Sequence, residues 1–135
     1  MALTGKRIVI TGGAGILGQG VARAAQSQGA DVVLLDVVSG TTELVGNLIQ
    51  VDLADSASLH SCFTQIGDFD VLANIAGGFA MGPAVYETED ELWDAMFSIN
   101  VTTLRRVLNE AVPRLLARGR GSVINVGALG ALRGA

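Results

Sequence analysis

Three spaced glycines are the residues of this sequence whose pattern most directly suggests chemistry. Gly13-x-Gly15-x-x-Gly18 has the spacing of a dinucleotide-binding loop, and Gly12-x-x-Gly15-x-x-Gly18 has a wider-spaced form of it. A tight turn, a close approach of backbone to a pyrophosphate, and a helix lying against a strand each require a residue without a Cβ. The pattern therefore indicates a loop whose backbone holds phosphate groups.

The segments on either side of this loop support the interpretation. Residues 6–10, Lys-Arg-Ile-Val-Ile, are interpreted as a short buried strand, and a helical pattern begins after the loop. The first turn of that helix, which includes Ile16 and Leu17, would offer N–H groups and a partial positive charge to phosphates. A second apolar run ends in Asp36, about 20 residues beyond the loop, where a carboxylate can accept both hydroxyls of an adenosine ribose. We predict dinucleotide binding; the alternative is a glycine-rich loop that only packs.

Strand-like and helical patterns alternate along the whole chain. Further strands are expected at 31–36, 47–51, 69–73 and 122–126, and the segment 37–46 is expected to be irregular. Further helices are expected at 56–66, with Asp55 as N-cap, and from about 88 to 118 in one or two pieces, with Thr88 and Glu91 as a capping box and a kink at Pro113. This alternation predicts an α/β fold with a doubly wound, Rossmann-like parallel sheet of five strands in three α/β/α layers. Residues 1–135 are expected to form a single dinucleotide-binding domain.

Small or polar residues follow each expected strand. Asp52, Asn74 and Gly77 lie just after strands, as do the glycine loop and Asp36. The carboxyl ends of parallel strands meet at one edge of a sheet, and ligands bind there, where the strand order reverses. These residues are therefore expected to form one site. The helix after the glycine loop should pack through its periodic positions, which are Leu17, Val21, Ala24, Ala25 and Gln28.

The composition argues against several other functions. The net charge of −4 is the wrong sign for a phosphate-backbone partner, so no nucleic acid partner is expected. No apolar run approaches the roughly 18 residues of a membrane span, and no signal sequence begins the chain, so we expect a cytoplasmic protein with no membrane partner. His60 and Cys62 are the only histidine and cysteine, so no metal site is expected. Cys62 is expected to be a buried thiol on an apolar helix face.

Over essentially all 135 residues, the chain resembles the short-chain dehydrogenase/reductase family. In addition to the glycine loop, Asp52-Leu53 is similar to the acid-plus-apolar pair that holds the adenine ring in that family. Asn74-Ile75-Ala76-Gly77 is similar to the family's Asn-Asn-Ala-Gly motif, with an Ile in place of the second Asn. In the family, that motif braces the sheet and lines the cofactor cleft. The resemblance therefore implies that both segments help to bind the cofactor.

The resemblance implies one catalytic residue in this sequence, whereas the family's other catalytic residues are absent from it. Asn100 sits where the family keeps a helical Asn, whose kinked backbone holds a water in the proton relay. The family's Tyr-x-x-x-Lys pair, which exchanges the substrate proton, is absent because the sequence holds one Tyr, Tyr86, and one Lys, Lys6. Ala128 stands where the catalytic Ser is expected. Because two further strands of the family would follow residue 135, the resemblance implies a cofactor-binding N-terminal part, incomplete at the C-terminus.

Three functions remain open on this basis. The first is an NAD-dependent oxidoreductase that transfers hydride between the nicotinamide cofactor and an alcohol or carbonyl, with these residues as its cofactor-binding part. The second is a non-catalytic dinucleotide-binding module, and the third is a remnant that associates with another chain. NAD is expected rather than NADP, because the carboxylate of Asp36 would repel a 2′-phosphate. The resemblance implies a small-molecule substrate and a homo-oligomer, and these 135 residues alone are expected to be inactive.

Overall fold

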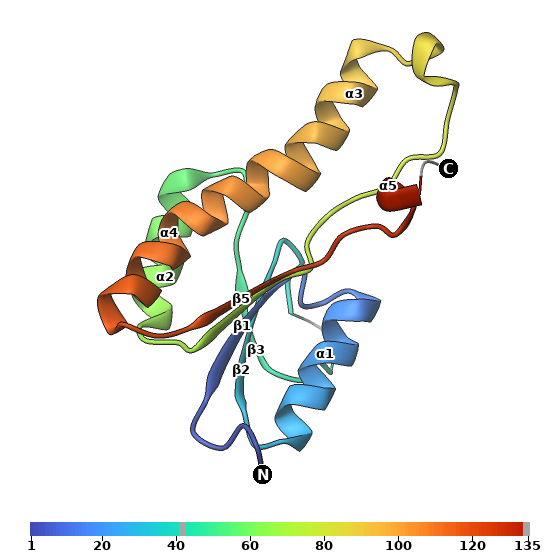
Figure 1. The fold of residues 1–135 in the computed structure, drawn as a ribbon. Helices are drawn as coiled ribbons and strands as arrows, with labels where there is room; N and C mark the ends of the chain where they lie inside the picture. The colour runs from blue at the N-terminus through green and yellow to red at the C-terminus, as the bar shows by residue number, and fades with distance from the viewer. Residues whose placement is uncertain (41–42, 134–135) are drawn as a thin grey trace.

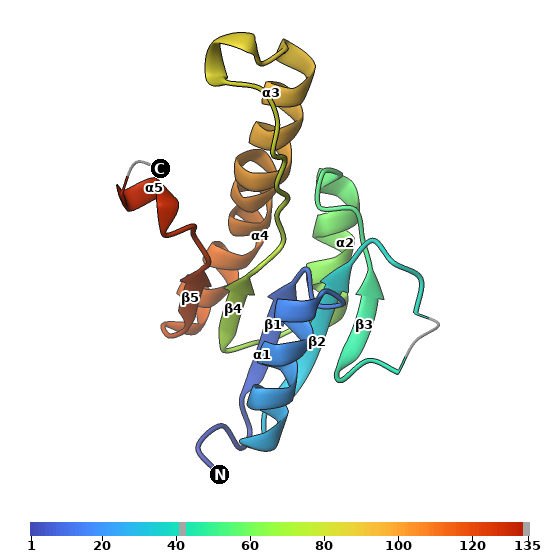
Figure 2. The same ribbon diagram turned by 90° about the vertical axis from the view of Figure 1, so that its right-hand side faces the viewer.

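Five parallel strands form the centre of the computed structural model, which describes residues 1–40 and 43–133. Their order across the sheet is β3-β2-β1-β4-β5, so the strand order reverses between β1 and β4 (Figure 2). The strands are β1 Arg7–Thr11, β2 Asp31–Asp36, β3 Asn47–Gln50, β4 Val71–Asn74 and β5 Ser122–Asn125. The predicted doubly wound parallel sheet is therefore confirmed. The segment expected to be irregular, 37–46, has no helix or strand where it is described, and positions 41–42 lie outside the described residues.

Helices cover both faces of the sheet. Helix α1, Ile16–Ser27, lies on one face, and α2, Ser56–Ile66, and α4, Thr103–Arg118, lie on the other (Figure 1). Because successive side chains of a strand point to opposite faces, β1 contributes to two separate cores. Val9 packs in the core with α2 and α4, whereas Ile10 packs in the core with α1. The three-layer α/β/α arrangement follows from these two cores.

Small residues form most of the packed face of α1, together with the buried Gln19 and the partly buried Val21, which was predicted. Gly18, Ala22 and Ala25 are buried, whereas Leu17 is 53% exposed and Ala24 is also exposed. The expectation that Leu17 belongs to the packed face is therefore wrong. The physical reason is that α1 approaches the strands closely, which only small side chains permit. Leu17 lies instead at the carboxyl edge of the sheet.

One long helical stretch follows β4. Helix α3, Asp90–Phe97, continues into α4 through the π-helical turn η2, Ser98–Thr102, so the expected helix forms in two pieces. None of the α3 residues is buried, and Figure 1 shows α3 extending beyond the sheet. Helix α4 continues through Pro113 to Arg118. A short helix α5, Gly130–Arg133, follows β5.

One of the two predicted helix caps forms. The Oδ1 of Asp55 accepts a hydrogen bond of 3.1 Å from the N–H of Ala57 and so caps α2 as predicted. The capping box at Thr88 is wrong. Its hydroxyl donates to the carbonyl of Ala84 across the 3-10 helix η1, Val85–Glu87, and α3 begins with Glu89 as an N-cap that has no side-chain hydrogen bond.

Candidate functional site

Two glycines of the loop occupy positions that no larger residue fits. Gly12 has a φ of +65°, and a Cβ there would lie 2.9 Å from the Cα of Ala76. A Cβ on Gly18 would lie 2.8 Å from the Cα of Gly13 and would also overlap the carbonyl of Gly12. The N–H groups of Gly12 and Gly13 both donate to the carbonyl of Leu35, at 2.8 and 3.3 Å. The loop is thus held tightly between β2 and the residues after β4.

The N-terminus of α1 begins at this loop without a capping side chain. Gly15 is the N-cap residue, and in the described part of the chain no side chain caps the first turn and no acidic residue lies in it. Ile16, which is 96% exposed, and Leu17 belong to this turn and line a cavity. Free backbone N–H groups and the helix dipole attract anions to such a terminus. The terminus therefore suits a phosphate group.

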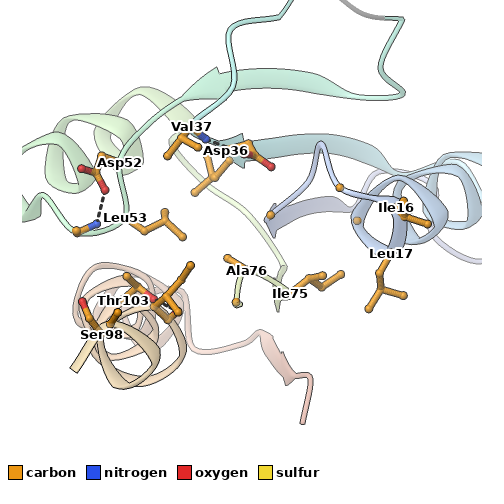
Figure 3. A pocket seen from close by; sticks show the side chains of 18 residues that line it. Ile16, Leu17, Asp36, Val37, Asp52, Leu53, Ile75, Ala76, Ser98 and Thr103 are labelled. Carbon is orange, nitrogen blue, oxygen red and sulfur yellow. Dashed lines mark hydrogen bonds between the residues drawn. The ribbon is translucent and has the colours of Figure 1, made fainter. Parts of the chain in front are cut away.

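A cavity of about 620 Å³ runs along the carboxyl ends of the strands (Figure 3). Its size falls within the range of about 300–1,000 Å³ typical of small-molecule sites. Of the residues predicted from the sequence, the lining includes Gly12, Gly15, Ile16, Leu17, Gly18, Asp36, Asp52, Leu53, Ala76 and Gly77. The other three predicted residues, Gly13, Asn74 and Asn100, are not among the residues that line the cavity. The structure thus brings most of the predicted residues together at one edge of the sheet.

The carboxylate of Asp36 lies on the cavity wall at the end of β2 (Figure 3). Its Oδ2 accepts a hydrogen bond of 3.0 Å from the N–H of Ala14, and its Oδ1 accepts one of 2.8 Å from the N–H of Val37. Each carboxylate oxygen can accept a further hydrogen bond. Because no Lys or Arg is among the described residues that line the cavity, this charge favours hydroxyl donors over a second anion.

Asp52 and Leu53 form the neighbouring part of the wall, after β3. The Oδ1 of Asp52 accepts a hydrogen bond of 2.9 Å from the N–H of Ala54, which fixes the turn that follows (Figure 3). Leu53 is buried in the core with α2 and α4 but reaches the cavity. In such a pair, the apolar side chain can contact the face of a planar base while the carboxylate accepts a hydrogen bond from the edge of the base. This pair therefore suits an adenine ring.

A buried hydroxyl holds the chain where it leaves β4. The Oγ1 of Thr11, which is 1% exposed, accepts hydrogen bonds from the N–H groups of Ile75 and Ala76, at 3.1 and 3.2 Å. Asn74 donates from Nδ2 to Oδ1 of Asn125 at 2.9 Å, across β4 and β5. Its own buried Oδ1 has no hydrogen-bond partner among the described residues. Asn74 therefore braces the sheet beneath the cavity.

Asn100 lies in the π-helical turn, and both ends of its side-chain amide bond to the backbone. Its Oδ1 accepts from the N–H of Gly78 at 3.0 Å, and its Nδ2 donates to the carbonyls of Gly78 and Met96, both at 2.9 Å. A Cβ on Gly77 would lie 2.7 Å from the same Oδ1. The amide of Asn100 thus ties the segment after β4 to the helical turn.

The cavity is also lined by residues that were not individually predicted as site residues, namely Leu35, Val37, Ala54, Ile75, Ala95, Ser98, Ile99 and Thr103, of which Ile75 lies within a predicted segment. The first four are chain neighbours of predicted residues. Leu35 lies inside β2, whereas Val37, Ala54 and Ile75 follow strands, and that position is a signal that could have found them. The last four come from the helical stretch after β4. The hydroxyl of Thr103 donates to the carbonyl of Ile99 at 2.7 Å in the π-helical turn. Which face of this stretch meets the cavity depends on that irregular turn, which the sequence does not specify.

The Tyr, Lys, His and Cys side chains of the described residues do not line the cavity. Tyr86 is 85% exposed in η1, and Lys6 lies 3.8 Å from the carboxylate of Asp70, at the amino ends of the strands. His60 is exposed on α2 and lies 3.2 Å from Glu110 of α4. Burial raises the pKa of the Cys62 thiol to about 11, so Cys62 is an inert buried thiol as expected. Among the described residues, no group of His, Cys, Asp and Glu is arranged to hold a metal ion.

The chain belongs to the short-chain dehydrogenase family, whose model, described as "short chain dehydrogenase", matches residues 6–135. Members of this family are oxidoreductases that bind nicotinamide cofactors. The chain is 33% identical over 136 residues to short chain dehydrogenase adrF of Penicillium rubens, covering 95% of this chain and 53% of that protein. It is 32% identical over 138 residues to a D-xylose 1-dehydrogenase of Caulobacter vibrioides, covering 95% of this chain and 55% of that one.

Solved structures agree with this membership. The crystal structure of an NADH-dependent reductase complexed with NAD matches with a TM-score of 0.85 and 27% identity, over 98% of this chain and 63% of that one. A short chain dehydrogenase/reductase family protein matches with a TM-score of 0.87 and 28% identity, over 97% of this chain and 58% of that one. The chain thus spans about half the length of the curated relatives it matches. Among the helices of residues 1–40 and 43–133, none combines the length and apolar character that a membrane crossing requires.

Proposed function

We propose that this chain is the NAD-binding part of an enzyme that exchanges hydride between a nicotinamide cofactor and an alcohol or carbonyl substrate. The observation that carries the proposal is the carboxylate of Asp36 on the cavity wall, held by the N–H of Ala14, with no cationic residue among the described lining. Such a group accepts hydrogen bonds from the two hydroxyls of an adenosine ribose and repels a 2′-phosphate. NAD is therefore the preferred cofactor in this proposal, and NADP the weaker one.

The other residues of the site have roles consistent with a cofactor whose adenosine ribose lies against Asp36. The N–H groups at the start of α1, beside Gly15, hold the pyrophosphate. Asp52 and Leu53 hold the adenine ring, and Ala76 and Gly77 form the wall on which the rest of the cofactor lies. The bound cofactor supplies or accepts the hydride. Asn74 supports this wall from below, and Asn100 holds the segment after Gly77 in place.

A second candidate is a dinucleotide-binding module without turnover, and the placement of Tyr86 and Lys6 favours it for these 135 residues alone. A positioned general acid or base typically contributes about 10²–10⁴-fold to such a reaction. Tyr86 and Lys6 lie at different ends of the sheet, and neither lines the cavity. Ala128 has no hydroxyl to orient a substrate carbonyl. We therefore expect cofactor binding without oxidation or reduction.

A titration of the purified chain tests both candidates. NADH binding is followed by the change in NADH fluorescence, in parallel with NADPH, and NADH oxidation is then followed with ketones, aldehydes and quinones. Saturable binding of NADH that is tighter than that of NADPH, with no turnover above buffer, supports the proposal. Failure to bind NADH rules it out. Turnover that disappears in Tyr86→Phe would show that these residues form a complete enzyme with a different acid.

We further propose that residues 1–135 act as one domain, that the substrate is a small molecule, and that the protein is a cytoplasmic homo-oligomer. The exposed strand β5 supports self-association, because it pairs with β4 and leaves Ile124 and Val123 accessible. Sedimentation over a wide concentration range checks this part of the proposal. A monomer at every concentration would contradict it.

A further inference from the structure

One buried polar side chain in α1 is not explained by packing alone. Gln19 directly follows the third glycine of the loop and is 6% exposed. Its Nε2 donates to the carbonyl of Gly13 at 2.8 Å and, more weakly, to the carbonyl of Val45 at 3.3 Å. Its Oε1 accepts from the N–H of Val45 at 2.9 Å. Burying an amide is unfavourable unless its hydrogen bonds are made, and here both ends of the amide are engaged.

The hydrogen bond to Gly13 has a specific geometric consequence. The carbonyl of Gly13 and the N–H of Ala14 belong to the same peptide group, which is planar and rigid. Gln19 holds the oxygen of this peptide, and Asp36 accepts from its N–H at 3.0 Å. The peptide is therefore fixed at both ends. If the hold on the oxygen is lost, the peptide can rotate, and the N–H no longer keeps the carboxylate of Asp36 in its observed orientation.

The hydrogen bonds to Val45 join Gln19 to a second segment of the chain, which follows β2. Val45 precedes β3, at the far end of the connection that begins with Val37, which lines the cavity. Its N–H and carbonyl both pair with the amide of Gln19, as one strand residue would pair with another. The N–H of Val37 in turn donates to Asp36. Gln19 thus lies where the glycine loop, α1 and the segment after β2 meet.

We propose that Gln19 is a positioning residue of the dinucleotide site, which acts by orienting the Gly13–Ala14 peptide and, through it, the carboxylate of Asp36. The inference rests on the proposed function, because the group being positioned is the one that binds the ribose. A purely structural role would make a different prediction. It would lower the stability of the chain but leave the affinity of the folded chain for NADH unchanged.

The first experiment compares Gln19→Met with Gln26→Met. Methionine preserves the length of the side chain and removes its hydrogen bonds, and Gln26 is an exposed residue of the same helix. The dissociation constants of NADH and ADP-ribose are measured at a temperature at which circular dichroism shows each variant folded. We expect Gln19→Met to weaken both ligands about tenfold and by the same factor, and Gln26→Met to change neither. A lower melting temperature for Gln19→Met with unchanged dissociation constants would overturn the inference.

A double-mutant cycle tests whether Gln19 acts through Asp36. Gln19→Met is introduced into the wild-type chain and into Asp36→Ala. Residues that act through each other give non-additive effects. We expect Gln19→Met to weaken NADH less than about twofold once Asp36 has been removed. The same loss in both backgrounds would show that Gln19 acts independently of Asp36 and would contradict the proposal.

Amide hydrogen exchange in the wild-type chain provides a test if Gln19→Met does not fold. Val45 does not line the cavity, so a slowing of its N–H exchange beyond the slowing that ligand binding gives to the globally exchanging amides of the core reports a connection to the site. We expect NADH to slow exchange at Ala14 and Val45 together, by more than at those core amides. Slower exchange at Ala14 with no such additional slowing at Val45 would overturn the inference. Absence of any NADH binding to the wild-type chain would instead refute the proposed function, so the two failures are distinguishable.

Discussion

The carboxylate of Asp36 and the backbone N–H of Ala14, 22 residues apart in the sequence, are joined by a hydrogen bond of 3.0 Å. This contact links the end of β2 to the glycine loop before any ligand binds. The acid that the sequence pattern associates with a ribose therefore also helps to shape the loop that it faces. Substitutions at Asp36 are expected to affect both the geometry of the loop and its selectivity.

Asp36→Ala is expected to weaken NADH binding about 10- to 100-fold, because charge-assisted hydrogen bonds to the ribose are lost. The preference for NADH over NADPH should narrow in the same variant, because the repulsion of a 2′-phosphate is removed. Fluorescence titration of both cofactors measures the two effects. Asp68→Ala is the control, since Asp68 lies exposed before β4, at the opposite end of the sheet. Equal loss of affinity in both variants would show that overall charge, rather than position, is responsible.

Gly18→Ala is expected to lower the free energy of unfolding by about 1–3 kcal/mol and to weaken NADH binding more than tenfold. The added Cβ would meet the backbone of Gly12 and Gly13 and force α1 away from the loop. Gly20→Ala is a matched control in the same helix, where a Cβ meets nothing within 4 Å. That variant should gain about 0.5–1 kcal/mol, because Ala is the better helix former. Chemical denaturation measures both changes, and a Gly18→Ala variant as stable as the wild-type chain would contradict the close approach.

Thr11→Val is expected to lower the free energy of unfolding by about 2 kcal/mol, because the N–H groups of Ile75 and Ala76 lose their shared acceptor. Val has nearly the same shape as Thr, so the change isolates the hydroxyl. Thr11→Ser retains the hydroxyl and should cost less than about 1.5 kcal/mol for its missing methyl group. Urea denaturation distinguishes the two variants. If Ser is as destabilising as Val, the hydroxyl is not the important group.

The pair of Glu110 and Arg114 predicts a pH dependence of stability. The Oε2 of Glu110 lies 2.6 Å from Arg114 and 3.2 Å from His60. Partial burial raises the pKa of Glu110, but the hydrogen bonds from Arg114 and His60 outweigh it and hold this pKa below its usual value of 4.5. A carboxylate with a lowered pKa stabilises the fold above its unfolded pKa, and this contribution is lost as the pH falls through its folded pKa.

Glu110→Gln should therefore be less stable than the wild-type chain by about 0.5–1 kcal/mol at pH 7, where the pair is charged. The difference should shrink as the pH falls below 4.5 and the wild-type carboxylate takes up a proton. Urea denaturation at a series of pH values provides the measurement, and Glu91→Gln, on the exposed helix α3, is the control. A difference that stays constant down to acid pH would show that shape, rather than charge, explains the effect.

The order of the elements and the location of the site could be read from the sequence, because they depend on local signals. Apolar runs of strand length, the spacing of the glycines and the cap at Asp55 each act within a few residues of the chain. The carboxyl ends of parallel strands must share an edge, so residues placed after strands were expected to meet. Asp36, Asp52 and Gly77 do line one cavity. The family membership rests on the same local motifs.

Contacts between distant segments were decided only by the tertiary structure. The packed face of α1 follows from how closely the helix approaches the strands, so Ala22 is buried and Leu17 is not, although their apolar character gives no hint of the difference. The partners of Gln19 are the backbone groups of Gly13 and Val45, which any residue type would present. Side-chain types therefore specify where the site forms, whereas hydrogen bonds from side chains to the backbone of distant segments, which have no local signal in the sequence, decide how the site is held in shape.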